Sequence, residues 1–251
     1  MVGMSKQNAP DGPNRISHIT GSVNWQRWHF AADLAKDRLA ELINEAAQEF
    51  YVRIFAFALM SNHFHLVAQS PSEREFRALT TRVTACRHRR SWPPGHQKSS
   101  VRSQFMSRFR SKMSRECQRD LGVEGRFWTG QYDARAVDSA LSFAIRIAYD
   151  HRNPVKAKLV TAPEDYAWSS ARSWLSGAPC GIEIALDPLP FNADPATLHR
   201  AVLAYQGSSA LDGAEGLSEL LKARDCGDRE LSDLLRERGI PLHNCGTDAA
   251  V

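Results

Sequence analysis

Hydrophobic positions recur at two different spacings in the first half of the chain, and each spacing predicts an element. Apolar side chains in residues 33–50 recur every three to four positions, as in a helix that buries one face. Alternating or β-branched apolar runs predict strands at 15–23, 51–60 and 63–69. Only Ser61 and Asn62 separate the last two runs, a spacing typical of a tight hairpin.

The pattern continues with helix and strand signals in turn. A carboxylate-rich turn follows Ser72 and predicts a helix that begins near this residue. A second basic helical stretch spans 101–122, and 126–137 predicts a strand. Residues 138–153 predict a helix that Asp or Ser caps and that stops at Asn153-Pro154. The order β-α-β-β-α-β-α predicts an α+β fold, a ferredoxin-like antiparallel sheet with helices packed on it.

Composition changes near Gly177, where Pro, Gly and Asp become frequent. We therefore expect three segments: a flexible N-terminal tail at 1–14, a folded domain at 15–176, and a linker with an acidic helical extension at 177–251. The N-terminus lacks an apolar signal core, and no stretch approaches about 18 apolar residues, so we expect a cytoplasmic protein with no membrane partner. The five cysteines form no C-x-x-C pair, which argues against a disulfide framework or a cysteine zinc site.

Charge is distributed unevenly along the chain, although the net charge is only +4. Between Arg82 and Arg119 there are eleven Lys or Arg and one acid. From Val160 onward there are seven Lys or Arg and fourteen Asp or Glu. Such a cationic segment favours nucleic acid as a partner over the alternative, a solvated helix face. The acidic C-terminal segment either covers the basic segment as an autoinhibitory lid or binds a partner.

His63 and His65 lie one residue apart in the strand at 63–69, so their side chains share a face about 7 Å apart. Two imidazoles on one face can converge on a metal ion, or can be hydrogen-bonded in a polar patch. Two histidines do not complete a metal site, so a further ligand must come from elsewhere.

The helix at 138–153 is a source for such a ligand. Tyr149 and Asn153 are four residues apart and therefore lie on one face of this helix. Tyr149 could be a core aromatic and Asn153 a helix stop. The functional alternative makes Asn153 a carbonyl ligand and Tyr149 a nucleophile whose phenolate attacks phosphorus.

Three segments resemble a known family. "FALMSNHFHLV" resembles the Met-Pro-Asn-His-hydrophobe-His-Leu signature of the HUH single-tyrosine transposases, and "FWTGQYDARAV" is similar to their Trp-rich strand. "AYDHRNPVKAKLV" with "PEDYAWSSARSW" resembles their tyrosine motif and the segment after it. The REP-associated tyrosine transposases are the most similar branch, over about residues 15–176. Gln131 departs from the pattern, because many members carry an arginine there.

The resemblance implies that 15–176 is a catalytic domain, with His63 and His65 as metal ligands, Tyr149 as the nucleophile and Asn153 as a supporting ligand. It implies Mg²⁺ or Mn²⁺ rather than zinc. It also implies a single-stranded DNA endonuclease and strand transferase that binds REP-like hairpin DNA and cuts it through a 5′-phosphotyrosine, in DNA transposition or recombination. Both a monomer and a homodimer are compatible with it.

Basic and aromatic residues are available to hold such DNA. Eight could track phosphates: Arg82, Arg87, Arg89, Arg90, Arg102, Arg108, Arg110 and Lys112. Trp92, Phe127 and Trp128 could stack on bases, although core packing is the alternative for the last two. Two other functions stay open: a non-catalytic regulator that binds hairpin nucleic acid, and a metal-dependent hydrolase that activates water. Tyr132 is the reserve nucleophile.

Overall fold

A four-stranded antiparallel sheet forms the centre of the protein. The computed structural model describes residues 15–24, 30, 32–83, 100–121, 125–192 and 202. The strands are β1 (Ile16–Ser22), β2 (Arg53–Leu59), β3 (His63–Gln69) and β4 (Asp133–Val137), in the order β2-β3-β1-β4. All three pairings are antiparallel, which confirms the predicted ferredoxin-like α+β fold.

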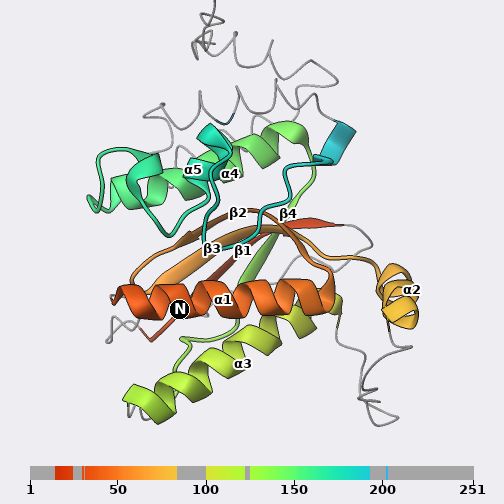
Figure 1. Ribbon diagram of the computed structural model, residues 1–251, viewed down its shortest axis with the longest axis horizontal. Coiled ribbons are helices and arrows are strands. Elements are labelled where there is room, and N and C mark those ends of the chain that lie inside the picture. The colour runs from red at the N-terminus through yellow and green to blue at the C-terminus, as the bar shows by residue number, and fades with distance from the viewer. Residues whose placement is uncertain are drawn as a thin grey trace, which may run out of the picture.

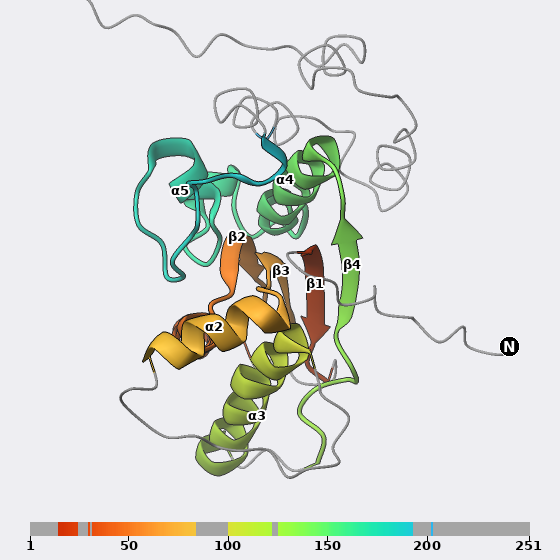
Figure 2. The ribbon, with the colours of Figure 1, turned by 90° about the vertical axis from the view of Figure 1, so that its right-hand side faces the viewer.

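Helices cover both faces of this sheet (Figure 1). Helices α1 (Asp33–Phe50) and α3 (Val101–Leu121) pack together on one face. Helices α4 (Ala140–Lys156) and α5 (Ala171–Ser176) lie on the other, so that the strands lie between α3 and α4 in the turned view of Figure 2. Helix α2 (Glu73–Val83) follows β3, and its N-terminus is capped as predicted, because Ser72 Oγ accepts a hydrogen bond from the amide of Glu75. Two short 3-10 helices, η1 (Pro163–Asp165) and η2 (Pro190–Asn192), follow α4.

The alternation of β3 separates apolar from polar side chains. Phe64 and Leu66 are fully buried in the apolar core under α1 and α3. His63 and His65 point to the opposite face, toward α4, which agrees with the period-2 prediction. Gly21 lies directly across from Phe64 in the β1–β3 ladder, and the Phe64 ring occupies the space that a side chain at this glycine would need.

Two predicted boundaries were wrong. The strand predicted at 126–137 is present only as β4, because Phe127 and Trp128 pack into the core instead of extending the ladder, with a single bridge from Trp128 to Val23. The helix predicted to stop at Asn153 continues to Lys156. Pro154 lies in the last turn, where the loss of one N–H breaks only one helical bond while its carbonyl still accepts from Leu159.

The segment from Tyr166 to Trp174 runs along the open edge of β2. The Tyr166 hydroxyl donates to the Leu59 carbonyl, the Ser170 amide donates to the Phe57 carbonyl, and Trp174 Nε1 donates to the Phe55 carbonyl. These bonds occupy backbone groups that an edge strand would otherwise leave unpaired. The Asp-Tyr-Ala-Trp-Ser-Ser motif therefore has a structural role here.

Residues beyond the proposed domain boundary at 176 return to the sheet. Ile182 is fully buried in the core, and the Ala185 amide donates to the Ile54 carbonyl. Apart from Val202, the predicted helical extension from residue 193 onward lies outside the described residues, as does the predicted tail at 1–14. Among the helices that the structure describes, none combines the length and the hydropathy that a membrane crossing needs.

Candidate active site

The predicted nucleophile and the predicted metal ligands lie side by side in one chain. Tyr149 projects from α4 toward the sheet, with its ring centroid 6.0 Å from that of His65 on β3. His63 is the neighbour of His65 on the same face, with ring centroids 4.9 Å apart and ring planes nearly perpendicular. The packing of α4 on β2 and β3 therefore brings together residues that are more than 80 positions apart in the sequence.

Hydrogen bonding leaves one nitrogen of His63 available for a ligand. His63 Nδ1 lies 2.7 Å from Asn62 Oδ1, and because the amide oxygen only accepts, Nδ1 carries the proton. His63 Nε2 then retains its lone pair, which is the form in which imidazole binds a metal ion.

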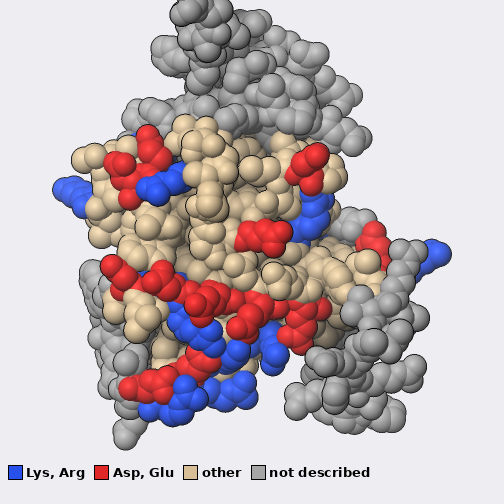
Figure 3. Space-filling view, viewed as in Figure 1, with Lys and Arg blue, Asp and Glu red and all other residues tan. Residues whose placement is uncertain are grey.

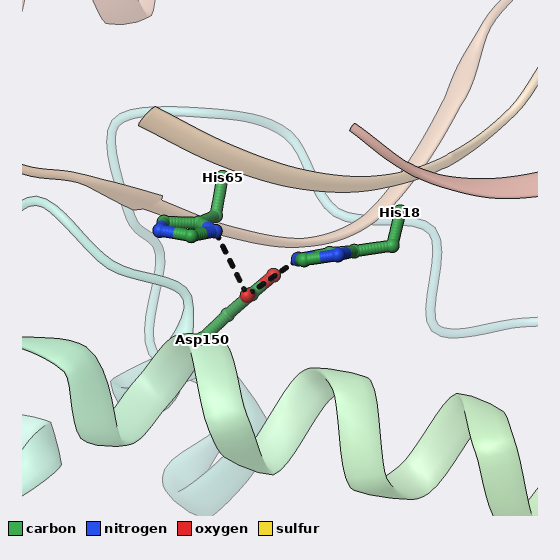
Figure 4. Close-up of side chains that lie close together, drawn as sticks. All are labelled: His18, His65 and Asp150. Atoms are coloured by element: carbon green, nitrogen blue, oxygen red, sulfur yellow. Dashed lines mark hydrogen bonds and ion pairs between the residues drawn. The ribbon is translucent and has the colours of Figure 1, made fainter. Parts of the chain in front are cut away.

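Two residues that sequence reasoning missed complete this cluster, His18 on β1 and Asp150 on α4. Ligand atoms of His18, His65 and Asp150 all lie within 4.8 Å of one another, and all three side chains are buried (Figure 4). Asp150 rises from α4 between the two rings, which stack with centroids 5.5 Å apart. A signal for His18 was its position two residues after Ile16 in the first predicted strand, which places both side chains on the same face of that strand. A signal for Asp150 was its position directly after Tyr149, the predicted nucleophile.

Asn153 lies on α4 one turn beyond Tyr149, as predicted. Its Nδ2 is buried without a hydrogen-bond partner in the described part of the chain, and the same holds for Asp150 Oδ2 and His65 Nδ1. Unpaired buried polar atoms are uncommon in folded proteins and gather where an ion, water or substrate completes a site.

Burial controls the protonation of these groups. Burial lowers the pKa of His65 to about 3, against the opposing effect of the Asp150 carboxylate, and burial also lowers the pKa of His63. Both imidazoles are therefore neutral near pH 7 and able to bind a cation. Burial raises the pKa of Tyr149 and Asp150 raises it further, so the phenol keeps its proton near pH 7.

Three of the eight predicted phosphate-binding residues have partners inside the protein that occupy their charged groups. Arg108 pairs with Glu49 at 2.6 Å and Lys112 with Glu45 at 2.7 Å, so the acidic band over α1 meets the basic side chains of α3 (Figure 3). Arg102 is buried and donates to Ser17 Oγ. Arg82 lies in α2, and Arg87, Arg89, Arg90 and Trp92 lie outside the described residues.

The other side of α3 borders an open pocket of about 700 Å³. Its cationic lining comes from Arg110, Arg115 and Arg126. Its hydroxyl lining comes from four serines at helical spacing, Ser103, Ser107, Ser111 and Ser114. Trp128 also borders it, and the Arg110 guanidinium lies 4.8 Å above the Trp128 ring. That ring is otherwise packed among Phe30, Phe64 and Phe127 and is only 8% exposed.

The pocket and the histidines meet at one end of the sheet. Trp128 bridges Val23, the Val23 amide bonds the carbonyl of Asn62, and Ser22 pairs with His63. Two strand spacings, about 10 Å, therefore separate the backbone at Trp128 from that at His63.

Comparison with known proteins finds a family match over part of the chain. Residues 14–93, which include the H-x-H strand, match the model of the family described as "Transposase IS200 like". No curated protein sequence matches the chain.

Two solved structures are similar to this chain in fold. The chain is similar to a REP-associated tyrosine transposase bound to a REP hairpin, with a TM-score of 0.50 and 15% identity over 75% of this chain and 96% of that one. It is also similar to a "putative transposase" from Deinococcus radiodurans R1, with a TM-score of 0.33 and 13% identity over 57% of this chain and 93% of that one. The resemblance to the HUH single-tyrosine transposases is thereby confirmed over residues 14–93. The fold of the chain is similar to that of a REP-associated tyrosine transposase.

Proposed function

We propose that the protein is a metal-dependent single-stranded DNA endonuclease and strand transferase that cuts hairpin DNA through a 5′-phosphotyrosine. The observation that carries this proposal is the position of Tyr149, whose ring lies 6.0 Å from that of His65 in the same chain. The match of residues 14–93 to IS200-like transposases and the REP-associated fold support it.

His63 and His65 are the proposed metal ligands, with Asn153 as a supporting oxygen ligand. The residues fit a divalent cation, because both imidazoles are neutral and His63 has a free Nε2, while unpaired polar atoms are buried nearby. A site made of imidazole and oxygen ligands binds Mn²⁺ more tightly than Mg²⁺, but either cation can occupy it. When bound, the cation polarises the scissile phosphodiester and lowers the cost of a phenolate.

Tyr149 performs the covalent step. Its hydroxyl oxygen bonds to phosphorus as the bond from phosphorus to the 3′ oxygen breaks, and the phenolic proton is balanced by the proton gained on the released 3′-hydroxyl. The number of phosphodiester-type bonds is unchanged, so the reverse reaction with another 3′-hydroxyl rejoins strands. Tyr149 is half-buried beside a partly exposed His63, so the nucleophile is held by packing while one side of the site stays open.

The DNA path is proposed to run from the pocket beside α3 around the end of β1 to His63. Arg110, Arg115 and Arg126 would neutralise phosphates, and the serine hydroxyls would donate to their oxygens. This path excludes the mixed-charge α1–α3 face, where Arg108 and Lys112 already have carboxylate partners.

The test is covalent trapping. The full chain is incubated with Mn²⁺ or Mg²⁺ and labelled REP-like hairpin DNA, and a protease-sensitive adduct is sought on a denaturing gel beside Tyr149→Phe and the control Tyr132→Phe. We expect an adduct in the wild type and in Tyr132→Phe, and none in Tyr149→Phe. DNA retention in native gels without any adduct would instead indicate a non-catalytic binding protein, and cleavage that survives in Tyr149→Phe would indicate a hydrolase that uses water.

A further inference from the structure

Asp150 is a buried carboxylate in the middle of the candidate site. It is fully buried, its Oδ1 lies 2.8 Å from His18 Nε2, and the same oxygen lies 3.5 Å from His65 Nδ1. A buried carboxylate is costly unless neighbouring groups stabilise it. Here His18 makes a hydrogen bond to Asp150, and His65 lies at the longer distance of an ion pair.

The direction of the hydrogen bonds shows what His18 does. Arg146 Nη1 lies 3.4 Å from His18 Nδ1, and because a guanidinium only donates, His18 Nδ1 accepts. His18 Nε2 therefore carries the proton and donates it to Asp150 Oδ1. Both ring nitrogens of His18 are engaged within the protein, which argues against His18 as a direct metal ligand.

His65 is oriented differently. Its Nδ1 lies 3.5 Å from Asp150 Oδ1, which is an ion-pair distance and not a hydrogen bond. The nearby carboxylate favours the proton on Nδ1, and Nε2 then keeps the lone pair. His63 has the same arrangement, with Nδ1 bound to Asn62 and Nε2 free. Histidines that bind metals commonly donate the other ring N–H to a carboxylate or carbonyl, which sets the ring orientation and strengthens the ligand.

We propose that Asp150 is a positioning residue for the metal ligand His65, and that Arg146 and His18 hold Asp150 in place through the chain Arg146–His18–Asp150–His65. The inference rests on the proposed function, since it presumes that His63 and His65 bind the cation. Because Asp150 directly follows Tyr149 on α4, the same contact also keeps the nucleophile helix in register with the strand that carries the ligands.

The first test is Mn²⁺ binding to the full chain without DNA, by calorimetry, for the wild type, Asp150→Asn and His18→Gln. Asp150→Asn is expected to weaken Mn²⁺ affinity by about 10- to 100-fold, with adduct formation recovering at saturating Mn²⁺. His18→Gln is expected to cause a smaller loss in the same direction, and His63→Ala to abolish binding. The control His151→Gln alters another fully buried residue of α4, outside the chain of contacts, and should leave affinity unchanged.

Two outcomes would overturn the inference. Unchanged Mn²⁺ affinity in Asp150→Asn would remove the positioning role. Loss of binding in His18→Gln with retention in His63→Ala would make His18, His65 and Asp150 the direct ligands. A wild-type chain that forms the adduct while Asp150→Asn behaves normally defeats this inference alone, whereas a wild type that neither binds Mn²⁺ nor forms the adduct defeats the proposed function.

A second readout does not depend on the metal. Two-bond ¹H–¹⁵N correlation spectra of the metal-free protein report which ring nitrogen carries the proton. We expect His65 to be protonated on Nδ1 in the wild type and to become a mixture of tautomers in Asp150→Asn. Protonation on Nε2 in the wild type would contradict the proposal even if the variant folded poorly.

Discussion

The two faces of the sheet bury different kinds of side chain. Under α1 and α3 the strands present Ile19, Phe57, Phe64 and Leu66 to an apolar core. Under α4 the same strands carry His18 and His65 beside apolar neighbours such as Phe55 and Val67. Polar groups cost more to bury than apolar groups of the same size. The face under α4 is therefore less stable than an all-apolar face would be, but its polar groups are held in a fixed arrangement. Both faces contain an apolar core cluster, and the face under α4 also carries the candidate chemistry.

Metal removal should show the largest difference between the two faces of the sheet, because it should affect the reaction much more than the stability of the fold. A chelator is expected to lower the rate of adduct formation at least about 100-fold, since a bound cation supplies several kcal/mol of transition-state stabilisation. The unfolding free energy should change far less, because the α1–α3 core contains no proposed ligand. The adduct assay and urea unfolding, run on the same chelated sample, check both statements. Persistence of the adduct in chelator would remove the cation from the mechanism.

Phe64→Ala should affect the opposite face, with a loss of about 3–5 kcal/mol in unfolding free energy. Gly21→Ala tests the same contact from the other strand, because the added Cβ would lie 2.5 Å from Cζ of Phe64. We expect it to cost about 1–3 kcal/mol alone and little in the Phe64→Ala background. Additive losses, measured by denaturant unfolding of the double variant, would show that the two residues do not compete for space.

Acid should destabilise the packing of α4 on the sheet through His151. Burial lowers the pKa of this residue to about 3, and its Nε2 lies 2.7 Å from Ser170 Oγ. Below about pH 6.5 the His151 imidazole is protonated in the unfolded chain but stays neutral in the folded chain. The stability that is present above pH 6.5 is therefore lost as the pH falls toward 3. The loss is about 1.4 kcal/mol per pH unit for this group.

The control for this prediction is His151→Gln, which lacks the titrating group. Urea unfolding at pH 7 and pH 5 should show a wild-type decrease about 2 kcal/mol larger than that of the variant. Equal decreases in the two proteins would assign the acid sensitivity to other groups, such as His65.

The smallest effects should come from two arginines of α3 with different surroundings, Arg108 paired with Glu49 of α1 and Arg115 at the border of the pocket. Arg108→Ala removes an exposed ion pair with Glu49 and should change stability by less than about 1 kcal/mol. Arg115→Ala should weaken DNA binding and reduce the slope of log affinity against log salt by about one, since Arg115 borders the pocket. Salt titrations of both variants decide this, and a larger change of slope in Arg108→Ala would place the DNA on the α1–α3 face.

Local patterns were sufficient for much of this arrangement. Period-2 alternation placed His63 and His65 on one face of β3, and helical spacing placed Asn153 one turn beyond Tyr149. The two-residue hairpin and the Ser72 cap also follow from neighbours in the chain. Each of these features depends on backbone geometry within a few residues, which sequence periodicity reports directly.

Charge on α3 was the least predictable feature. Eleven basic residues against one acid within 38 positions favoured a uniformly cationic surface. The folded chain instead sets Glu45 and Glu49 of α1 against Lys112 and Arg108. A window along the sequence cannot include a counter-charge that lies about 60 positions away.

The sequence by itself determined the elements, the pair of histidines, the tyrosine and the family they resemble, because each is written in short-range spacing. Only the tertiary structure decided that His18 and Asp150 join them. Their contact requires β1 to lie beside β3 and α4 to pack on the same face of the sheet, a long-range arrangement set by the burial of the whole core. The same packing decided which arginines face a pocket and which face a carboxylate.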